Sequence, residues 1–338
     1  MDTMLHITPS YTSLPDGFSI PADQLHPATT STVVTLPVID LSGSRDDVCH
    51  AILHAGKEFG FFQVVNHQIC EETLREMEAV CDEFFELPVE DKMHLCSDDK
   101  SKPNRLFSGS NYKTSSKMYW IDCLRLTHTI RIGDSKNNWP NKPQRLREVF
   151  ENFIEQTRVL GMELLRMLCK SLGLPLGYFD GDLSGGDMVL GVNLYPPCPE
   201  PSRMLGLPPH CDRNLLTLVL SGAVQGMEVF YNGDWIKVEP MPNAFIVNFG
   251  LQIEVVTNGI LKSVEHRVVT NMSLARTSVL TTINAANDCL LGPAEELLSD
   301  SNPPRYRTIM CRDFVRIYTE WLEQCEGDMK HHMKPFKI

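Results

Sequence analysis

The second half of the chain consists of short β-type segments separated by turns, and this pattern restricts the fold more than any other feature. After Gly185 the apolar runs are DMVLGVNLY, LLTLVL, GMEVFYNGDWIKVEP, AFIVNF, HRVVT and RTSVLTTINA. Many short strands at such spacing predict a closed antiparallel structure, because closure hides the sheet edges. The sequence therefore predicts either a β-sandwich or a jelly roll in this part of the chain.

Segments with helical periodicity flank the β-rich part on both sides. Their apolar residues recur at helical spacing, and Pro88 and Gly173 stop two of them. The predicted helices cover residues 46–59, 70–88, 143–174 and 295–323. Residues 36–42 and 60–67 are predicted strands, whereas residues 96–145 show no firm pattern.

These segments divide the chain into four predicted parts. An extended lead-in rich in Pro, Ser and Thr precedes a helical N-terminal region, a β core and a C-terminal helical cover. The four parts span residues 1–35, 36–180, 185–290 and 291–338. The predicted fold class is therefore mixed α and β, with helices flanking a β core.

Composition and charge restrict the partners that the protein can have. The formal net charge is −12 at pH 7, which argues against nucleic acid or an anionic membrane as the main partner. No apolar stretch approaches the roughly 20 residues of a membrane-spanning helix, and no secretory signal is visible. The 11 cysteines include no Cys-x-x-Cys pair, which favours free thiols in a reducing compartment. We expect a cytoplasmic monomer that binds a small molecule.

The stretch LGLPPHCDRNLLTLVL, residues 205–220, places His210 and Asp212 at the mouth of a predicted strand. No other histidine in the chain is followed two positions later by an acid. So short a pattern also arises by chance, as a loop histidine beside a turn aspartate. At a strand end, however, side chains one residue apart point the same way, so both can face one ion. Cys211 would then point to the other side and pack as a small apolar residue.

A histidine farther along the chain adds a third candidate ligand. His266 lies in SVEHRVVT, a second β-type run that can neighbour the first. Two imidazoles and one carboxylate on one face of a metal leave the opposite positions open, which suits non-haem Fe(II) and its use of dioxygen. The sequence therefore predicts that His210, Asp212 and His266 form a catalytic metal centre.

An arginine and a serine follow soon after His266 in the segment RTSVLTTINA. Arg276 and Ser278 are two residues apart on a predicted strand, so both can face the inside of the β structure. A guanidinium with a hydroxyl can grip a carboxylate through charge-assisted hydrogen bonds. 2-Oxoglutarate meets both demands of such a site, because its keto-acid end chelates iron and its far carboxylate suits Arg276.

The order of these motifs resembles that of a known family. NLYPPCP, HCD, SVEHRVV and RTS follow one another as in the plant 2-oxoglutarate- and Fe(II)-dependent dioxygenase superfamily, and LPVIDLS and GFFQVVNH resemble its N-terminal part. The resemblance covers nearly the whole chain and implies a double-stranded β-helix (jelly-roll) core flanked by helices. Within the superfamily, the chain is most similar to the deoxymugineic-acid dioxygenases and the hyoscyamine hydroxylases.

The resemblance also implies roles for residues and cofactors. Fe(II) would be held by His210, Asp212 and His266, and the co-substrate 2-oxoglutarate by Arg276, Ser278, Tyr195 and Asn193. Dioxygen would be consumed, with ascorbate in support, and a small plant metabolite would be hydroxylated or desaturated with release of succinate and CO2. The implied substrate is of the mugineic-acid or the alkaloid kind, although neighbours in such a superfamily often act on unrelated molecules.

Six further residues are candidates for the substrate pocket: Arg105, Phe107, Tyr112, Arg125, Phe249 and Leu251. Arg105 and Arg125 could bind a carboxylate of the substrate, which would suit an amino-acid-like molecule. The alternative is that both are surface or helix-capping arginines. Phe107 and Tyr112 lie in an irregular segment that could form a lid, or they could simply pack.

The sequence departs from the family pattern at two positions. Gln68 follows VVNH where the family usually has glycine, and a glycine there would serve a turn with positive φ, so Gln68 is expected to cost local strain. Leu251 follows NFG where many relatives carry an acid, which predicts a change of pocket shape.

Two other functions use the same residues. A binding protein of this fold that has lost catalysis would lack a metal ligand or the arginine, yet all five positions are present. A zinc hydrolase could use the same His-Asp-His face, but it would need a general base beside the metal and would leave Arg276 and Ser278 without a role.

Overall fold

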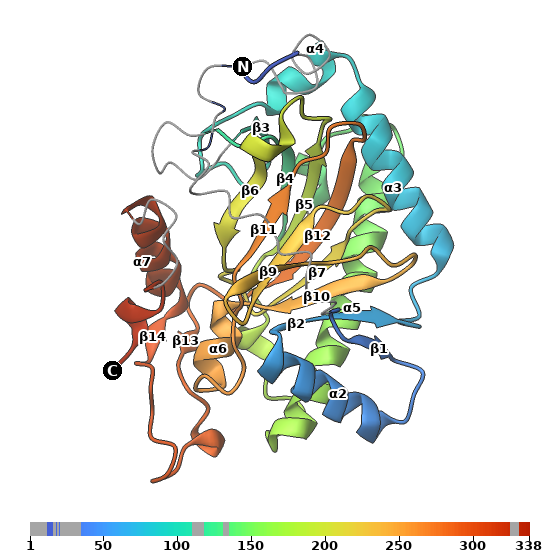
Figure 1. The fold of residues 1–338 in the computed structure, drawn as a ribbon. Coiled ribbons are helices and arrows are strands. Elements are labelled where there is room, and N and C mark those ends of the chain that lie inside the picture. The colour runs from blue at the N-terminus through green and yellow to red at the C-terminus, as the bar shows by residue number, and fades with distance from the viewer. Residues whose placement is uncertain are drawn as a thin grey trace.

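The computed structural model describes residues 12–15, 18, 20, 35–109, 118–130, 135–324 and 331–338. Two β-sheets face each other in this part of the chain, and helices cover the outside of the larger one (Figure 1). The predicted mixed α and β class with a jelly-roll core is confirmed.

The larger sheet has eight strands in the order β1-β2-β10-β7-β12-β5-β4-β3. Only β1 and β2 pair in parallel among these strands, and every other neighbour is antiparallel. Four of the strands come from the N-terminal region that the sequence describes as helical. The strands are β1 (Val38–Asp40), β2 (Phe61–Val65), β3 (Arg105–Ser108), β4 (Asp122–His128), β5 (Met188–Tyr195), β7 (Leu216–Leu220), β10 (Phe245–Phe249) and β12 (Arg276–Ile283).

The smaller sheet has four strands in the order β6-β11-β8-β9. They are β6 (Leu205–His210), β11 (His266–Val269), β8 (Met227–Tyr231) and β9 (Asp234–Lys237). Pro208 and Pro209 lie within β6, where the sequence predicts only a lead-in to the next strand. Proline cannot donate to a β ladder, and β6 accommodates both because it is the edge strand of its sheet.

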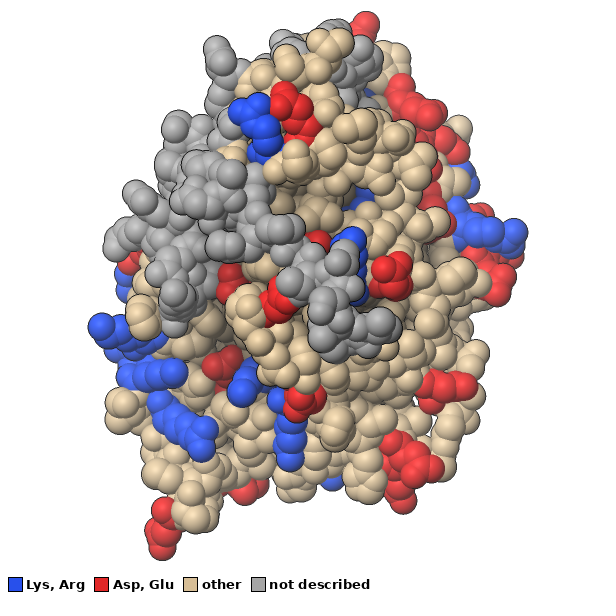
Figure 2. All heavy atoms as spheres, in the orientation of Figure 1, with Lys and Arg blue, Asp and Glu red and all other residues tan. Residues whose placement is uncertain are grey.

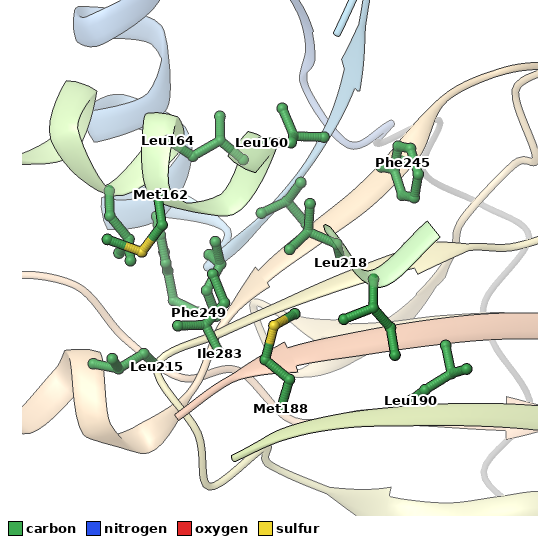
Figure 3. Packing of buried hydrophobic residues seen from close by; sticks show 14 of the residues in the cluster. Leu160, Met162, Leu164, Met188, Leu190, Leu215, Leu218, Phe245, Phe249 and Ile283 are labelled. Atoms are coloured by element: carbon green, nitrogen blue, oxygen red, sulfur yellow. The ribbon is translucent and has the colours of Figure 1, made fainter. Parts of the chain in front are cut away.

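Three long helices pack outside the larger sheet: α2 (Arg45–Glu58), α3 (Glu71–Glu86) and α5 (Leu146–Leu172). Figure 3 shows Leu160 and Leu164 of α5 above Leu218 of β7. Gly161 lets the helix approach closely, because a Cβ there would lie 2.4 Å from Ile283 Cδ1. Burial of such leucines stabilises the fold by about 1.5–3 kcal/mol each.

Strand alternation separates the two faces of the larger sheet. Leu190, Val192 and Leu194 of β5 belong to the core that packs under α5. Tyr195, on the other face, packs with Val268 of the smaller sheet. Residues in register with Tyr195 and its alternate neighbours therefore line the space between the two sheets.

The C-terminal part differs from the sequence prediction. Residues 298–310 are not helical, because Pro303 and Pro304 exclude a helix and the chain instead forms a hairpin of β13 (Leu290–Leu291) and β14 (Ile309–Met310). The helix α7 begins only at Cys311 and spans Cys311–Gln324. Together with α6 (Leu251–Val256), it lies at the end of the sheets where β6 terminates (Figure 1). The division into four parts stays a prediction.

Figure 2 shows acidic and basic side chains dispersed over one face, with basic ones gathered at the lower left and acidic ones along the right edge. Among the residues described, no helix is both long enough and apolar enough to span a bilayer.

Gln68 adopts the backbone conformation that its position suggested. Its φ is 67°, in the left-handed region, and its side chain is exposed. A residue other than glycine pays for this conformation with about 1–3 kcal/mol of strain. The positive φ expected at Gln68 is therefore confirmed, and the strain stays a prediction.

Substitution Gln68→Gly should raise the free energy of unfolding by about 1 kcal/mol, because it relieves the strain and removes no buried contact. Urea denaturation measures the change. Asn243→Gly is the matched control: Asn243 has a φ of 55°, and asparagine tolerates this conformation better, so a smaller gain is expected. A Gln68→Gly variant less stable than the unmodified protein would contradict the strain.

Candidate functional site

Two histidines face each other across the smaller sheet. His210 ends β6 and His266 begins β11, and the two are cross-strand partners in the antiparallel register. Their ring centroids are 4.1 Å apart. The ladder is irregular just beyond this pair, between His266 and Val268. Residues far apart in the sequence are thus placed side by side by backbone pairing.

Asp212 completes the group from the loop after β6. Its Oδ1 lies 3.8 Å from His210 Nε2 and 3.9 Å from His266 Nε2. The candidate ligand atoms of the three residues all lie within 4.8 Å of one another. The structure therefore brings together the three predicted metal ligands, and atoms this close can share one cation. Asp212 itself lies between two strands, because β6 ends at His210 and β7 begins at Leu216.

Backbone carbonyls orient the two imidazoles. His210 Nδ1 lies 2.8 Å from the Pro208 carbonyl, and His266 Nδ1 lies 3.3 Å from the Val264 carbonyl. A carbonyl only accepts, so each Nδ1 must carry the hydrogen when it bonds there. Each Nε2 then keeps its lone pair, which is the state that a metal ligand requires.

Hydrogen bonds fix the Asp212 carboxylate. Its Oδ2 accepts from Thr217 Oγ1 at 2.5 Å and from Asn248 Nδ2 at 2.8 Å. Its backbone carbonyl accepts the Leu251 N–H at 2.7 Å. Oδ1 is consequently the oxygen turned toward the histidines. Cys211 packs in the core on the other side, as predicted.

Burial and charge set the protonation of the group. Burial, reinforced by the neighbouring His210, lowers the pKa of His266 to about 4, although Asp212 opposes the shift. Burial raises the pKa of Asp212, but the charges of His266 and His210 and the hydrogen bonds from Asn248 and Thr217 outweigh it, so the net direction is downward. At neutral pH His266 is therefore neutral and Asp212 ionised, as metal binding requires.

Close packing at Gly250 supports the loop that carries Asp212. A Cβ on Gly250 would lie 2.0 Å from the backbone oxygen of Asn214. The Gly250 N–H also donates to the Leu215 carbonyl at 2.9 Å. The start of α6 therefore packs directly against the loop that carries Asp212.

Arg276 lies between the sheets with an unsatisfied donor. Its Nε donates to the Val224 carbonyl at 3.1 Å, and its guanidinium lies 5.2 Å from the centre of the Tyr195 ring. Its Nη1 is buried and has no hydrogen-bond partner among the described residues. Gly226 makes room for it, since a Cβ there would lie 2.8 Å from Arg276 Cδ. A buried cation with a free donor is suited to an anionic ligand.

The other predicted co-substrate residues lie around Arg276. Arg276 pairs in register with Tyr195, and Ser278 pairs with Asn193. All four are buried on the face that looks toward the smaller sheet. Burial raises the pKa of Tyr195 to about 12, so its hydroxyl stays protonated and can donate.

The predicted substrate residues fall into two groups. Arg105 and Phe107 lie on β3, and Arg125 lies on β4 directly opposite Arg105. Phe107 packs with Tyr195 between the sheets, so these three share the inner face. Tyr112 lies outside the described residues.

Phe249 and Leu251 require a correction. Asn248 reaches Asp212, so the next residue along β10, Phe249, points to the opposite face. Its ring packs on Phe62, 5.7 Å between centroids, beneath the helices. Leu251 is fully buried in the same core and touches the site only through its backbone N–H. Neither side chain is placed to line a pocket between the sheets.

Arg213 is a residue that the sequence analysis missed. It directly follows Asp212, and its Nη1 donates to Thr319 Oγ1 of α7 at 3.3 Å. It lies near enough to Arg125 and Arg105 for its charge to affect both. Burial lowers the pKa of Arg125 to about 10, with Arg213 and Arg105 adding to the shift, and Arg125 remains cationic at neutral pH. Its place beside a predicted ligand was the available signal.

Family models match two parts of the chain. Residues 186–285 match the model of the 2OG-Fe(II) oxygenase superfamily. Residues 36–145 match the N-terminal model described as non-haem dioxygenase in morphine synthesis. The first match contains His210, Asp212 and His266, which we call the metal-ligand group. It also contains Arg276, Ser278, Tyr195 and Asn193.

Curated proteins and a solved structure are similar over most of the chain. The 2'-deoxymugineic-acid 2'-dioxygenase of Hordeum vulgare is 58% identical, over 94% of both chains. The mugineic-acid 3-dioxygenase of Hordeum vulgare is 55% identical, over 94% of this chain and 93% of the other. Hyoscyamine 6-dioxygenase of Hyoscyamus niger is 37% identical over 90% of each. The structure of JOX2 in complex with 2OG, Fe and JA is 32% identical, covers 100% of this chain and 98% of that one, and superposes with a TM-score of 0.87.

Added Fe(II), under anaerobic conditions, should raise the unfolding midpoint of the protein. A ligand at 100 times its Kd contributes about 2.7 kcal/mol to stability. His210→Ala, Asp212→Ala and His266→Ala should each lose most of this gain, whereas His94→Ala, a change at an exposed histidine, should keep it. Differential scanning fluorimetry with metal analysis checks this, and a His266→Ala variant that retains the full gain would refute the ligand assignment.

Proposed function

The chain belongs to the 2OG-Fe(II) oxygenase superfamily, and on that premise we propose which of its residues hold iron, which hold 2-oxoglutarate and what kind of molecule it oxidises. It is an Fe(II)- and 2-oxoglutarate-dependent dioxygenase. The observation that carries the proposed roles is the clustering of His210, Asp212 and His266, in a fold that also buries Arg276 with a free donor.

Three side chains hold the iron in this proposal. His210 and His266 offer their Nε2 atoms, because their Nδ1 atoms face backbone carbonyls. Asp212 offers Oδ1, because Thr217 and Asn248 occupy Oδ2. One face of the metal remains for the co-substrate and dioxygen.

Four inner-face residues hold 2-oxoglutarate. Arg276 Nη1 donates to the far carboxylate with Ser278 beside it, and Tyr195 fixes the guanidinium from the opposite strand. Asn193 lies in register with Ser278 and borders the same space. With dioxygen, the iron and 2-oxoglutarate supply the oxidation of a C–H bond and release succinate and CO2, while the protein orients the target carbon and keeps water out.

A catalytically silent binding protein fits the structure less well. Such a protein would need none of the carbonyl contacts that hold both Nε2 atoms available for a metal. A zinc hydrolase is also disfavoured, because it gives no use to the free donor of Arg276. We propose instead that a small metabolite is hydroxylated or desaturated.

The names of three relatives suggest two kinds of substrate. The names of two relatives specify mugineic acid and its 2'-deoxy form, and that of a third specifies hyoscyamine. For this chain we propose an acid of the mugineic kind or an alkaloid. We propose that the enzyme acts on it as a cytoplasmic monomer, with ascorbate in support; the net charge of −12 agrees with this.

The direct test of the function begins with anaerobic protein, Fe(II) and 2-oxoglutarate, to which oxygen is then added. Succinate should form in proportion to a substrate drawn from metabolite extracts, and the product should gain the mass of one oxygen or lose two hydrogens. Protein that binds Fe(II) and 2-oxoglutarate but forms no substrate-dependent succinate with any extract would support the silent binding protein.

Substitution Arg276→Leu should weaken the binding of 2-oxoglutarate to the Mn(II)-loaded protein by roughly 10- to 100-fold, since it removes a charge-assisted hydrogen bond. Ser278→Ala should cost about fivefold, as expected for a neutral hydrogen bond. Calorimetric titration measures both, and Arg316→Gln, an exposed change on α7, is the control. Unchanged binding in Arg276→Leu would mean that another group holds the far carboxylate.

A further inference from the structure

Two arginines face each other on neighbouring strands, and neither forms an ion pair with a described residue. Arg105 of β3 and Arg125 of β4 are direct cross-strand partners. Like charges in such positions are destabilising. Across the described ranges, no carboxylate lies within ion-pair distance of either guanidinium. Ion pairs with described residues therefore do not explain why two arginines lie side by side here.

Arg105 also has donors that nothing in the described structure satisfies. Its side chain is 4% exposed, and its Nε and Nη1 are buried with no hydrogen-bond partner among the described residues. The guanidinium stacks 4.9 Å from the centre of the Phe107 ring, which orients it without neutralising it. Burying a guanidinium whose donors have no hydrogen-bond partner costs free energy of folding, and a bound anion would offset that cost.

The register places this pair on the same face as Arg276. One row across the sheet runs from Ser278 through Asn193 and Cys123 to Phe107, and the next runs from Leu280 through Gly191 and Arg125 to Arg105. With strands about 4.8 Å apart, Arg125 lies about 10 Å from β12 and Arg105 about 14 Å. The backbones of the pair thus lie two and three strands away from Arg276, on the face that looks into the same space.

Arg213 adds a third cation from another part of the chain. It is exposed at the end of β6, beside the metal-ligand group, and donates one hydrogen bond to Thr319. Its charge reaches both Arg105 and Arg125. No ion-pair partner of Arg213 lies among the described residues. The site between β3, β4 and the β6–β7 loop therefore carries three cations, and the acids that affect them, Asp98 and Asp99 at Arg105 and Asp187 at Arg125, lie beyond ion-pair distance.

We propose that Arg105, Arg125 and Arg213 form the subsite for a substrate that carries at least two carboxylates. One acid group would leave two of the three cations uncompensated, and a positively charged alkaloid would be repelled by all three. The inference rests on the proposed function and chooses between its two kinds of substrate. The subsite would hold the acidic end of the molecule and so orient the carbon to be oxidised toward His210, Asp212 and His266.

The test measures binding to the Mn(II)- and 2-oxoglutarate-loaded protein without oxygen, so that no turnover occurs. The probes are 2'-deoxymugineic acid, tricarballylate, butyrate, glucose 6-phosphate and hyoscyamine. At least one of the two polycarboxylates should bind about tenfold or more tightly than butyrate and hyoscyamine, with an affinity that falls as salt rises.

Variants locate the subsite. Arg105→Gln, Arg125→Gln and Arg213→Gln should each weaken the favoured polycarboxylate by about tenfold or more and leave 2-oxoglutarate binding unchanged, which also shows that the variant is folded. Arg125→Lys should keep part of the affinity, and Arg316→Gln should have no effect. If the unmodified protein does not bind 2-oxoglutarate, the proposed function itself is wrong.

The remaining outcomes overturn the inference alone. If 2-oxoglutarate binds normally but hyoscyamine or butyrate binds as tightly as the better-bound polycarboxylate, the three arginines do not select polycarboxylates. If glucose 6-phosphate binds more tightly than both, the site is for phosphate. If the three Gln variants leave polycarboxylate binding unchanged, the acid is held elsewhere.

Discussion

The antiparallel pairing of β6 with β11 is the constraint on which the functional part of the structure depends. It places His210 opposite His266 and leaves their rings 4.1 Å apart. β6 can tolerate two prolines because it is the edge strand of its sheet. The chain passes from the end of β6, at His210, directly into the loop that carries Asp212. The metal-ligand group is therefore built from backbone geometry, and the side chains need only short reaches. Hydrogen bonds to carbonyls, Thr217 and Asn248 then fix which atom of each ligand is available.

Charge between the two sheets is strongly unbalanced. Arg276 and Arg105 are buried, and each has a donor that no described residue satisfies, while Asp212 lies beside the two histidines. Burial lowers the pKa of both arginines, which indicates that the cationic form is disfavoured there in the absence of a ligand. Such sites reduce the stability of the empty protein and are preorganised for anions. An anionic co-substrate and an acidic substrate would complement the two positions separately.

The β core and the residues on its inner face could largely be predicted from the sequence, because the alternation of side chains along a strand is a local pattern. The alternation of β12 gave Arg276 and Ser278 one face, and the structure agrees. Contacts between distant segments could not be predicted as well. The two prolines argued against a strand where β6 lies. Phe249 was predicted to line a pocket, although its side chain points toward the helices. Arg213 was missed because its role depends on β3 and β4, which the sequence did not reveal as strands.

The helix α7 connects the metal-ligand group with the proposed acid subsite. The Tyr318 hydroxyl donates to the Cys211 carbonyl at 2.8 Å, and the next residue, Thr319, accepts from Arg213 at 3.3 Å. Two successive residues of one helix thus hold the backbone before Asp212 and the side chain after it. Because Arg105 and Arg125 lie on paired strands, Arg213 is the member of the subsite whose position depends on a helix. The packing of α7 consequently sets how far the third cation lies from the other two and from the metal ligands.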